Sequence, residues 1–329
     1  MRRRIIHPEE IKRVVARGAN WVGDAVMTVP ALRELRRVLP RAHVTLATRA
    51  WAEDIFTGAH FIDDLLIIDG QQRGAFSFVR QVKDWRARRF DLALLFPNAF
   101  EPALVAAAAR VPSRVGYATD GRGLLLTHPL DVPTWGGKRH EVFYYLNLVA
   151  ELERLLTGAS LVELHEPRFD LGVSAERQAR ARETLRAAGA SLERPLVALC
   201  PGSTNSRAKR WPPERFAALA DGLVRDLGAD CLLIGAAEEL GVTEEVVRLM
   251  RRAPIVLTGR TSLAETAAIL SFVDLLVTND TGPAHVADAL GRPVIVIFGP
   301  TDPVTTRPFS ALAEVVRRPP DCAPCMLRD

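Results

Sequence analysis

The sequence predicts an α/β protein with two doubly wound parallel sheets, each covered by helices. Short buried-strand segments alternate with helical segments along all 329 residues, a pattern typical of parallel sheets. The length suits two domains of roughly 150 residues each. Hydrophobic residues make up 48% of the chain and charged residues 25%, a balance that excludes a disordered or fibrous protein.

The first half begins with a predicted strand, a loop that contains glycine, and a helix. The strand is expected at residues 13–17, the loop at 18–24 and the helix at 25–38, where apolar residues recur every three or four positions. Asp24 occupies the position where a helix N-cap belongs. Further buried strands of this half are expected at residues 43–47, 65–68 and 92–95.

A polar stretch at residues 157–173, interrupted by glycine and proline, separates the two halves. We therefore expect two domains, residues 1–168 and 169–329. A helix follows an expected N-cap at Ser174, and the alternation of strands and helices resumes after Pro195. Strands are then expected at residues 196–200, 231–234, 255–257, 275–278 and 294–297, and helices at 214–226, 239–251, 263–272 and 283–290.

Charge is distributed unevenly between the halves. The formal net charge is +4, but residues 1–150 carry 22 Lys and Arg against 15 Asp and Glu, whereas residues 151–329 carry 21 against 24. A basic first half indicates an anionic partner such as phosphate or an acidic membrane surface, or it serves solubility alone. Nucleic acid is disfavoured because the basic residues are scattered and only 6% of the chain is aromatic.

The composition favours the reducing cytoplasm. No apolar run reaches the ~18–20 residues that cross a bilayer, and no apolar segment follows the basic start as in a secretory leader. Four cysteines are too few for a disulfide framework. Cys200 and Cys231 are expected in the core. Cys322 and Cys325 are expected to be free thiols, with half a zinc site or a redox pair as alternatives.

Three predicted strand-to-helix loops carry the candidate chemistry, because ligands of open parallel sheets bind outside the carboxyl ends of the strands. In the first loop, the N-terminus of the following helix favours an ionised Asp24, which can accept a proton from a hydroxyl group. Gly18 and Gly23 let the backbone turn tightly. A structural N-cap is the better supported alternative from this loop alone. The glycine spacing does not match the dinucleotide-binding fingerprint, which disfavours a dehydrogenase.

The second loop, residues 201–213, predicts a phosphate site. Small hydroxyl and amide side chains come first, and cations follow. Hydroxyls and backbone N–H groups bind phosphate oxygens, and cations neutralise them. The spacing differs from that of a Walker loop, and a solvated basic loop is the alternative. The polar residues are Ser203, Thr204, Asn205, Ser206, Arg207, Lys209 and Arg210.

The third loop, residues 279–285, precedes a helix expected to begin at Pro283. Asp280 and Thr281 supply hydrogen-bonding groups, and Gly282 allows close approach. His285 lies where the helix dipole favours neutral imidazole, and a structural role is an equal alternative. The second and third loops together predict a site for a phosphorylated, nucleotide-linked ligand, faced by the carboxylate of the first loop. This arrangement indicates group transfer from an activated phosphate ester to a hydroxyl.

Four blocks occur in order along nearly the whole chain: NWVGDAVMTVPALRELR (residues 20–36), LLFPNAFEPAL (94–104), PGSTNSRAKRWPPERFAALA (201–220) and VTNDTGPAHVADALGRPVIVIFGPTDP (277–303). With these blocks the chain resembles the glycosyltransferases of family 9, which transfer heptose from ADP-heptose to the inner core of lipopolysaccharide. The segments NWVGD, PNAF and AKRWP are more similar to members that add the second heptose than to members that add the first.

The resemblance implies the GT-B fold, in which two Rossmann-like domains face a cleft. Residues 1–168 would bind the acceptor and residues 169–329 the ADP-sugar. It also implies an inverting reaction without metal or cofactor. An oxocarbenium-like transition state places negative charge on the leaving diphosphate, which the cations of the second loop suit. Family members usually continue through a final helical segment, so the end at Asp329 is expected to be truncated or divergent.

The resemblance also implies roles for individual residues. Asp24 matches the catalytic base, and Lys209 matches the residue that stabilises the departing diphosphate. Glu239 matches the contact to the nucleoside, with Glu238 as its rival. The other implied donor-binding residues are Ser203, Thr204, Asn205, Arg210, Asp280, Thr281, Gly282 and His285, and the implied acceptor-binding residues are Asn20, Gly23, Arg114 and Arg122.

The implied acceptor is a phosphorylated core sugar on membrane-embedded lipid A. Residues 74–90 predict an amphipathic helix in which Phe78, Val82 and Trp85 share one face. One hypothesis is that this helix contacts anionic lipid at the inner membrane. A surface helix packed on the core is the better supported alternative. The cations of this segment are Arg80, Lys83, Arg86, Arg88 and Arg89.

Two other functions are compatible with the sequence. The chain could add the first heptose, or use another nucleotide sugar, and acceptor specificity separates these possibilities. From a different class, it could be a non-catalytic nucleotide-sugar-binding module, which would bind a donor without turnover.

Overall fold

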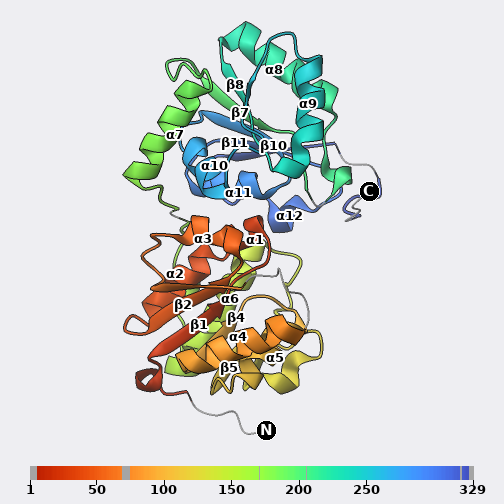
Figure 1. The fold of residues 1–329 in the computed structure, drawn as a ribbon. Helices are drawn as coiled ribbons and strands as arrows, with labels where there is room; N and C mark the ends of the chain where they lie inside the picture. Colours follow the sequence, from red (N-terminus) through yellow and green to blue (C-terminus); the bar gives the residue numbers. More distant parts are fainter. Residues whose placement is uncertain (1–5, 69–74, 170, 205, 319–320, 326–329) are drawn as a thin grey trace. The chain divides into compact units, whose positions relative to one another are not determined.

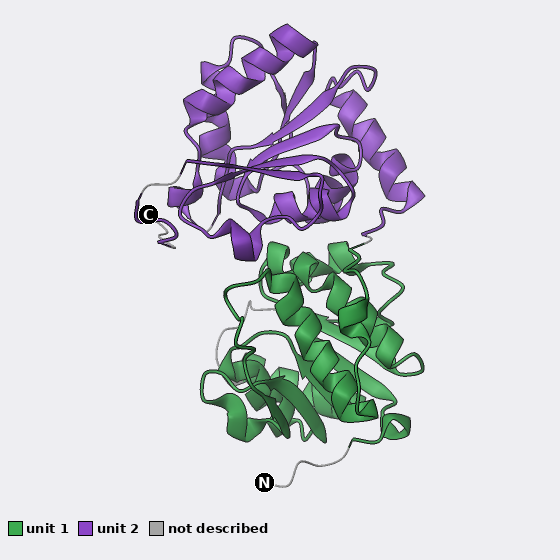
Figure 2. Cartoon of the chain, turned by 180° about the vertical axis from the view of Figure 1, so that it is seen from behind, with its two compact units in different colours: residues 1–169 green, residues 170–329 purple. Residues whose placement is uncertain are grey.

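Two parallel sheets of six strands each organise the chain in its computed structural model (Figure 1). The structure describes residues 6–68, 75–169, 171–204, 206–318 and 321–325. The chain divides into two compact units, residues 1–169 (unit 1) and 170–329 (unit 2), and each unit holds one sheet (Figure 2). The division lies one residue from the expected boundary, and the α/β class predicted from the sequence is confirmed.

The sheet of unit 1 has the order β3-β2-β1-β4-β5-β6, with every neighbouring pair parallel. At its centre, Val15 of β1 pairs with Thr45 of β2 and with Ala93 of β4. The strands are β1 (Arg13–Arg17), β2 (His43–Thr48), β3 (Asp64–Ile67), β4 (Leu92–Leu95), β5 (Ser113–Tyr117) and β6 (His128–Leu130). The α-helices are α1 (Val22–Met27), α2 (Val29–Val38), α3 (Ala50–Phe56), α4 (Ala75–Arg88), α5 (Phe100–Ala108) and α6 (Glu141–Thr157), and the short 3-10 helices are η1 (Pro8–Glu10), η2 (Arg122–Leu125) and η3 (Val162–Leu164).

Unit 2 repeats this architecture with the strand order β12-β11-β10-β7-β8-β9. Its parallel strands are β7 (Leu196–Cys200), β8 (Asp230–Leu233), β9 (Ile255–Val256), β10 (Leu275–Asn279), β11 (Val294–Phe298) and β12 (Ala313–Arg317). The helices are α7 (Ala175–Ala187), α8 (Pro213–Leu227), α9 (Leu240–Leu249), α10 (Leu263–Leu270), α11 (Gly282–Ala289) and α12 (Pro303–Thr306), with 3-10 turns η4 (Arg207–Lys209) and η5 (Ala237–Glu239). The Ser174 Oγ atom accepts a hydrogen bond from Arg177 N (3.3 Å), which confirms the predicted N-cap of α7.

The helix predicted at residues 25–38 is two helices, α1 and α2, which meet at Thr28. Thr28 bonds through its hydroxyl to the Ala25 carbonyl (2.7 Å), and Pro30 follows at the start of α2, where its missing N–H costs no hydrogen bond. Trp21 occupies the N-cap position of α1. Asp24 therefore lies inside the first turn of α1, and the sequence assignment of Asp24 as the N-cap residue is wrong.

Helix α4 covers one face of the sheet of unit 1 beside α5 (Figure 1). Trp85 is buried in the core cluster, and Phe78 and Val82 pack against the same cluster. The face that these three side chains share therefore points into the protein, as in the alternative of a surface helix packed on the core, and a contact of this helix with lipid would have to use the other face. Burial of a large apolar side chain stabilises the folded state by about 2 kcal/mol, which explains why this face of the helix is the inner one.

The end of unit 1 is fastened to α2 by a buried carboxylate of α6. Glu153 accepts hydrogen bonds from Arg37 Nη1 (2.9 Å), Ser160 Oγ (2.7 Å) and Leu161 N (2.8 Å). Burial alone would raise the pKa of Glu153, but these hydrogen bonds lower that pKa to about 2. The carboxylate thus stays charged and holds the segment after α6 against α2.

All four cysteines are free. Cys200 and Cys231 are buried within β7 and β8, as predicted, whereas Cys322 is exposed and Cys325 is partly exposed. In the described part of the chain, no helix is long and apolar enough to cross a membrane.

Candidate active site

The loop that leads from β1 to α1 is fixed by a buried cation. The Arg17 guanidinium donates one hydrogen bond to the Gly18 carbonyl and another from Nη2 to Asn20 Oδ1 (3.0 Å). Burial, and then the neighbouring charge of Arg49, lower the pKa of Arg17 to about 10, while Glu101 of α5 acts in the opposite direction. Arg17 therefore sets the path of the chain just before the turn that carries Asp24.

A second carboxyl group acts on the same region as Asp24. Glu141 is the first residue of α6, which packs against α1. Burial and the negative charge of Asp24 raise the pKa of Glu141 to about 6. The buried Tyr145, one turn further along α6, also has its pKa raised by burial and by Asp24. Sequence reasoning missed Glu141, because only the packing of α6 on α1 brings it into the electrostatic range of Asp24.

Replacing Glu141 with glutamine should lower kcat/KM about threefold at pH 7.5 but leave it unchanged near pH 5. Well below a pKa of about 6 the wild-type Glu141 is already neutral, as glutamine is, whereas above that pH its negative charge makes Asp24 a stronger base. Steady-state rates between pH 4.5 and 8 would measure the difference. Glu151→Gln, on the same helix but paired with Arg154 (2.7 Å), is the matched control and should leave the profile in place. An equal loss of kcat/KM in Glu141→Gln at pH 5 and pH 7.5 would contradict this coupling.

In unit 2 the second and third predicted loops lie side by side, because β7 pairs with β10. The buried Asn279 joins them: its Nδ2 donates to the carbonyls of Pro201 (2.9 Å) and Gly202 (3.1 Å), and its Oδ1 accepts from Trp211 N (2.9 Å). Sequence reasoning placed Asn279 in the loop but gave it no role. The Asn279 side chain thus bonds to two acceptors and one donor that lie about 70 or more residues away in the sequence, which is why spacing along the chain did not reveal its role.

Lys209 and Asp280 form an ion pair where these loops meet. The Nζ atom of Lys209 lies 2.7 Å from Asp280 Oδ2 and 3.3 Å from the Asp280 carbonyl oxygen. Thr301, which follows β11, donates from Oγ1 to the same Oδ2 atom (2.7 Å). Asp280 is buried, and Lys209 is one quarter exposed. The carboxylate therefore orients the ammonium, and Thr301 is a further member of the cluster that the sequence did not single out.

Glu239 is buried in a cradle that two glycines leave open. Its Oε2 accepts from Ala236 N (2.9 Å), and its Oε1 accepts from Thr204 Oγ1 (3.2 Å). A Cβ atom on Gly202 would lie 2.2 Å from Glu239 Cδ, and one on Gly235 would lie 2.7 Å from Oε2. Glu238 is exposed. Of the two rival glutamates, Glu239 is thus the one held against the second loop.

The Gly202→Ala variant should fold but bind ADP about tenfold more weakly, because the new methyl group displaces the Glu239 carboxylate. The clash is with the end of a flexible side chain, so we expect little loss of stability. Calorimetric titration with ADP and a thermal melt would test both parts. Gly241→Ala is the matched control, since a Cβ there meets nothing within 4 Å. Wild-type ADP affinity in Gly202→Ala would argue against a donor role for Glu239.

The remaining predicted donor residues surround these groups. Ser203 is buried, and its carbonyl accepts from Arg210 Nη2 (3.0 Å). Thr281 holds the N-cap position of α11, with its hydroxyl 3.1 Å from Thr278 Oγ1, and Gly282 is the first residue of the helix. His285 is buried in α11. Asn205 lies outside the described residues.

The predicted acceptor residues separate into two groups. Asn20 and Gly23 lie in the Asp24 segment. Arg122 is fully buried, and its guanidinium donates to the carbonyls of Tyr117, Pro97 and Ala99. Arg114 donates to the carbonyls of Leu125 and Val111, both at 2.6 Å. These contacts give both arginines a structural part in unit 1, where they hold loops together.

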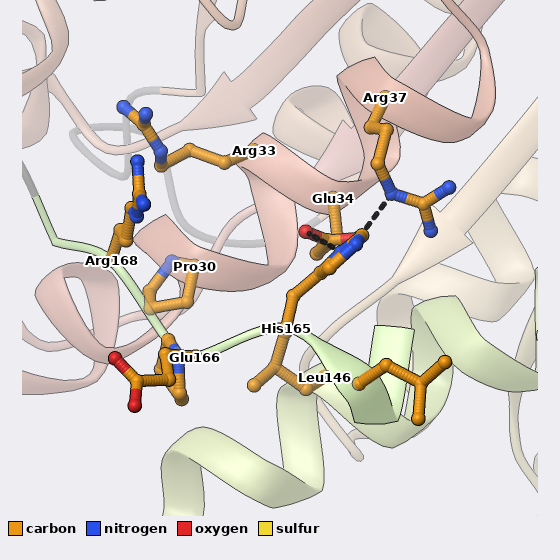
Figure 3. A pocket seen from close by; sticks show the side chains of 10 residues that line it. Pro30, Arg33, Glu34, Arg37, Leu146, His165, Glu166 and Arg168 are labelled. Carbon is orange, nitrogen blue, oxygen red and sulfur yellow. Dashed lines mark hydrogen bonds and ion pairs between the residues drawn. The ribbon is translucent and has the colours of Figure 1, made fainter. Parts of the chain in front are cut away.

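The predicted site residues are distinct from a pocket of about 560 Å³ on unit 1. The pocket lies between α2, α6 and residues 164–168, and Figure 3 shows its side chains. Glu34 is paired there with Arg37 and with His165 Nδ1 (3.0 Å), so part of the lining charge is neutralised within the protein (Figure 3).

Two Rossmann-like units in one chain, with polar loops at the carboxyl ends of both sheets, are the architecture of the GT-B fold. Comparison with known proteins agrees: the profile "Glycosyltransferase family 9 (heptosyltransferase)" matches residues 78–329. The chain belongs to glycosyltransferase family 9.

Individual relatives are similar over most of their length. The chain is 29% identical to lipopolysaccharide heptosyltransferase 2 of Escherichia coli K12, over 93% of this chain and 88% of the relative. Among solved structures, a family 9 glycosyl transferase from Veillonella parvula matches with a TM-score of 0.83 and 27% identity, over 93% of this chain and 85% of the other. The E. coli ADP-heptose lipopolysaccharide heptosyltransferase II matches with a TM-score of 0.77 and 27% identity, over 93% and 90%.

Proposed function

We propose that this protein is heptosyltransferase II, which transfers heptose from ADP-L-glycero-D-manno-heptose to the inner-core heptose of lipopolysaccharide with inversion and without a metal ion. Membership of family 9 and the similarity to two proteins named as heptosyltransferase II or 2 support this assignment. The observation that carries it is the pairing of Lys209 with Asp280 beside the Glu239 cradle, because this cluster offers a diphosphate and a nucleoside separate partners.

In this reaction the loops of unit 2 bind the donor. Glu239 accepts hydrogen bonds from the nucleoside, while Lys209, Arg210 and the hydroxyls of Ser203 and Thr204 bind the diphosphate oxygens. Negative charge grows on the diphosphate as the bond from its oxygen to the anomeric carbon breaks. A cation already oriented by Asp280 stabilises that charge without reorganising, so it contributes more to the transition state than to ground-state binding.

Asp24 of unit 1 serves as the base. Its carboxylate accepts the proton of the acceptor hydroxyl as that oxygen forms the new bond to the anomeric carbon. Attack and departure occur on opposite faces of the sugar, so a single displacement inverts the anomeric centre. Arg17 and Asn20 fix the loop in front of α1, so they position Asp24.

The decisive experiment is sugar transfer from ADP-heptose to lipid A-core acceptors that carry no heptose or one heptose. Transfer to the acceptor with one heptose, undiminished by a chelator such as EDTA, is the expected result. Transfer only to the acceptor without heptose would assign the chain to the first addition. ADP-heptose binding without turnover on either acceptor would identify a non-catalytic binding module.

The proposed acceptor is anchored in a lipid layer, so we further propose that the protein works in the cytoplasm at the surface of the inner membrane. The net positive charge of the first half of the sequence supports this, because anionic headgroups attract it. Cosedimentation with anionic vesicles would test the association.

A further inference from the structure

The outer face of α4 has an unusual distribution of side chains. Phe76 is 82% exposed and Val79 is 47% exposed. Arg80, Lys83 and Arg86 continue along the same face at helical spacing and are also exposed. The opposite face of the helix is the one that packs on the core of unit 1. We call these five residues the α4 surface.

The charges of the α4 surface are weakly compensated. The nearest acid on the helix, Asp84, lies 4.0 Å from Arg80, and that pair is largely exposed. Arg86 donates to the Ala108 carbonyl (3.1 Å), which leaves its charge in place. A solvated surface helix usually carries mixed charges and rarely exposes a phenylalanine almost completely. An apolar end followed by a row of cations is typical of a helix that lies in a lipid interface.

The apolar end of α4 lies at the carboxyl edge of the sheet of unit 1. α4 follows β3 and α5 follows β4 in a parallel sheet, so both helices begin at the edge where β1 delivers the Asp24 loop. The two helices pack together (Figure 1), and Phe100, the first residue of α5, is itself 45% exposed. The exposed aromatic rings therefore gather at the same edge of unit 1 as the proposed base.

We propose that the α4 surface binds anionic lipid, with the Phe76 and Val79 side chains among the acyl chains and with Arg80, Lys83 and Arg86 at the headgroup phosphates. The cations favour a lipid surface over an apolar protein partner, because three exposed basic residues, Arg80, Lys83 and Arg86, follow Val79 along this face. The inference deepens the proposed function and rests on it in one respect: a lipid-anchored acceptor would then present its sugar towards the edge that carries Asp24.

The test is cosedimentation with vesicles of phosphatidylethanolamine and phosphatidylglycerol, compared with vesicles of phosphatidylcholine alone. Wild-type protein should sediment with the anionic vesicles and much less with the neutral ones, and added salt should weaken the binding. Neutralising the three cations together, as Arg80→Gln, Lys83→Gln and Arg86→Gln, should weaken it roughly a hundredfold. Phe76→Ser with Val79→Ser should weaken it about tenfold.

The matched control is Arg248→Gln, Arg251→Gln and Arg252→Gln, which removes the same charge from exposed positions of unit 2 and should leave binding unchanged. Binding that survives both α4 variants, equal loss in the control, or no binding of the wild type to anionic vesicles would each overturn the proposal. Cosedimentation measures vesicle binding independently of heptose transfer. A protein that binds vesicles through α4 but transfers no heptose would leave this inference standing and overturn only the proposed function.

Discussion

Asparagine in place of Asp24 should lower kcat at least ~100-fold while the affinity for ADP-heptose changes little. The variant keeps the size of the side chain but cannot accept the proton of the acceptor hydroxyl. Donor binding is assigned to residues of unit 2, so a substitution in the first turn of α1 removes the base without touching them. Rates from single-turnover experiments and donor affinity from calorimetry would separate the two effects.

Two controls make the result on Asp24 specific. Asp131→Asn removes an exposed carboxylate of the same unit and should leave kcat unchanged. Asp24→Glu keeps a carboxylate but moves it by one methylene, so partial activity is expected from it and not from Asp24→Asn. A kcat for Asp24→Asn close to that of the wild type would show that Asp24 is not the base. The proposed donor site of unit 2 would not be affected by that result.

The buried strands were the most predictable part of the fold. β4 and β7 are runs of apolar residues buried in a parallel sheet, and β1 has three buried apolar residues between two arginines, so the sequence indicates this burial directly. β6 carries no such signal, because it is three residues long and contains Pro129, which an edge strand tolerates. β12, at the edge of the other sheet, alternates between partly buried and exposed residues.

The candidate site was predictable where it depends on single loops and not where it depends on contacts between them. Asp24, Lys209 and Asp280 follow strands, so their place at the carboxyl edges follows from the order of elements alone. The roles of Asn279 and Thr301 depend on β10 lying between β7 and β11, a topology that spacing along the chain does not reveal.

Arg122 shows another limit of the sequence. The resemblance implies it as an acceptor-binding residue, and in the structure its guanidinium donates to three backbone carbonyls that enclose it. Burial lowers its pKa, in keeping with a cation withdrawn from solvent. Sequence identifies the cation but not the carbonyl oxygens that make its burial tolerable, because those belong to residues up to 25 positions away.

Lys209→Ala should lower kcat about 100-fold or more, with a smaller loss of ADP affinity. The positive charge of Lys209 matters most in the transition state, when the diphosphate departs. In the ground state Arg210 and the hydroxyls of Ser203 and Thr204 also bind the donor, so the affinity for ADP depends less on Lys209. The exposed Lys138 offers a matched control, since Lys138→Ala removes the same side chain from unit 1 and should change neither quantity. Thermal melts are needed as well, because removing Lys209 leaves the buried Asp280 carboxylate without its cation.

Thr301→Val distinguishes a role in leaving-group stabilisation from a structural ion pair. The substitution removes the hydroxyl that holds Asp280 Oδ2 but leaves Lys209 in place, so a loosely oriented ammonium should lower kcat about tenfold with little change in KM. Arginine at position 209 would restore the charge without the geometry and should recover only part of the rate. If Lys209→Ala and Thr301→Val reduced stability but left kcat intact, the cluster would serve the fold of unit 2 and the diphosphate would require another cation, with Arg210 the nearest along the chain.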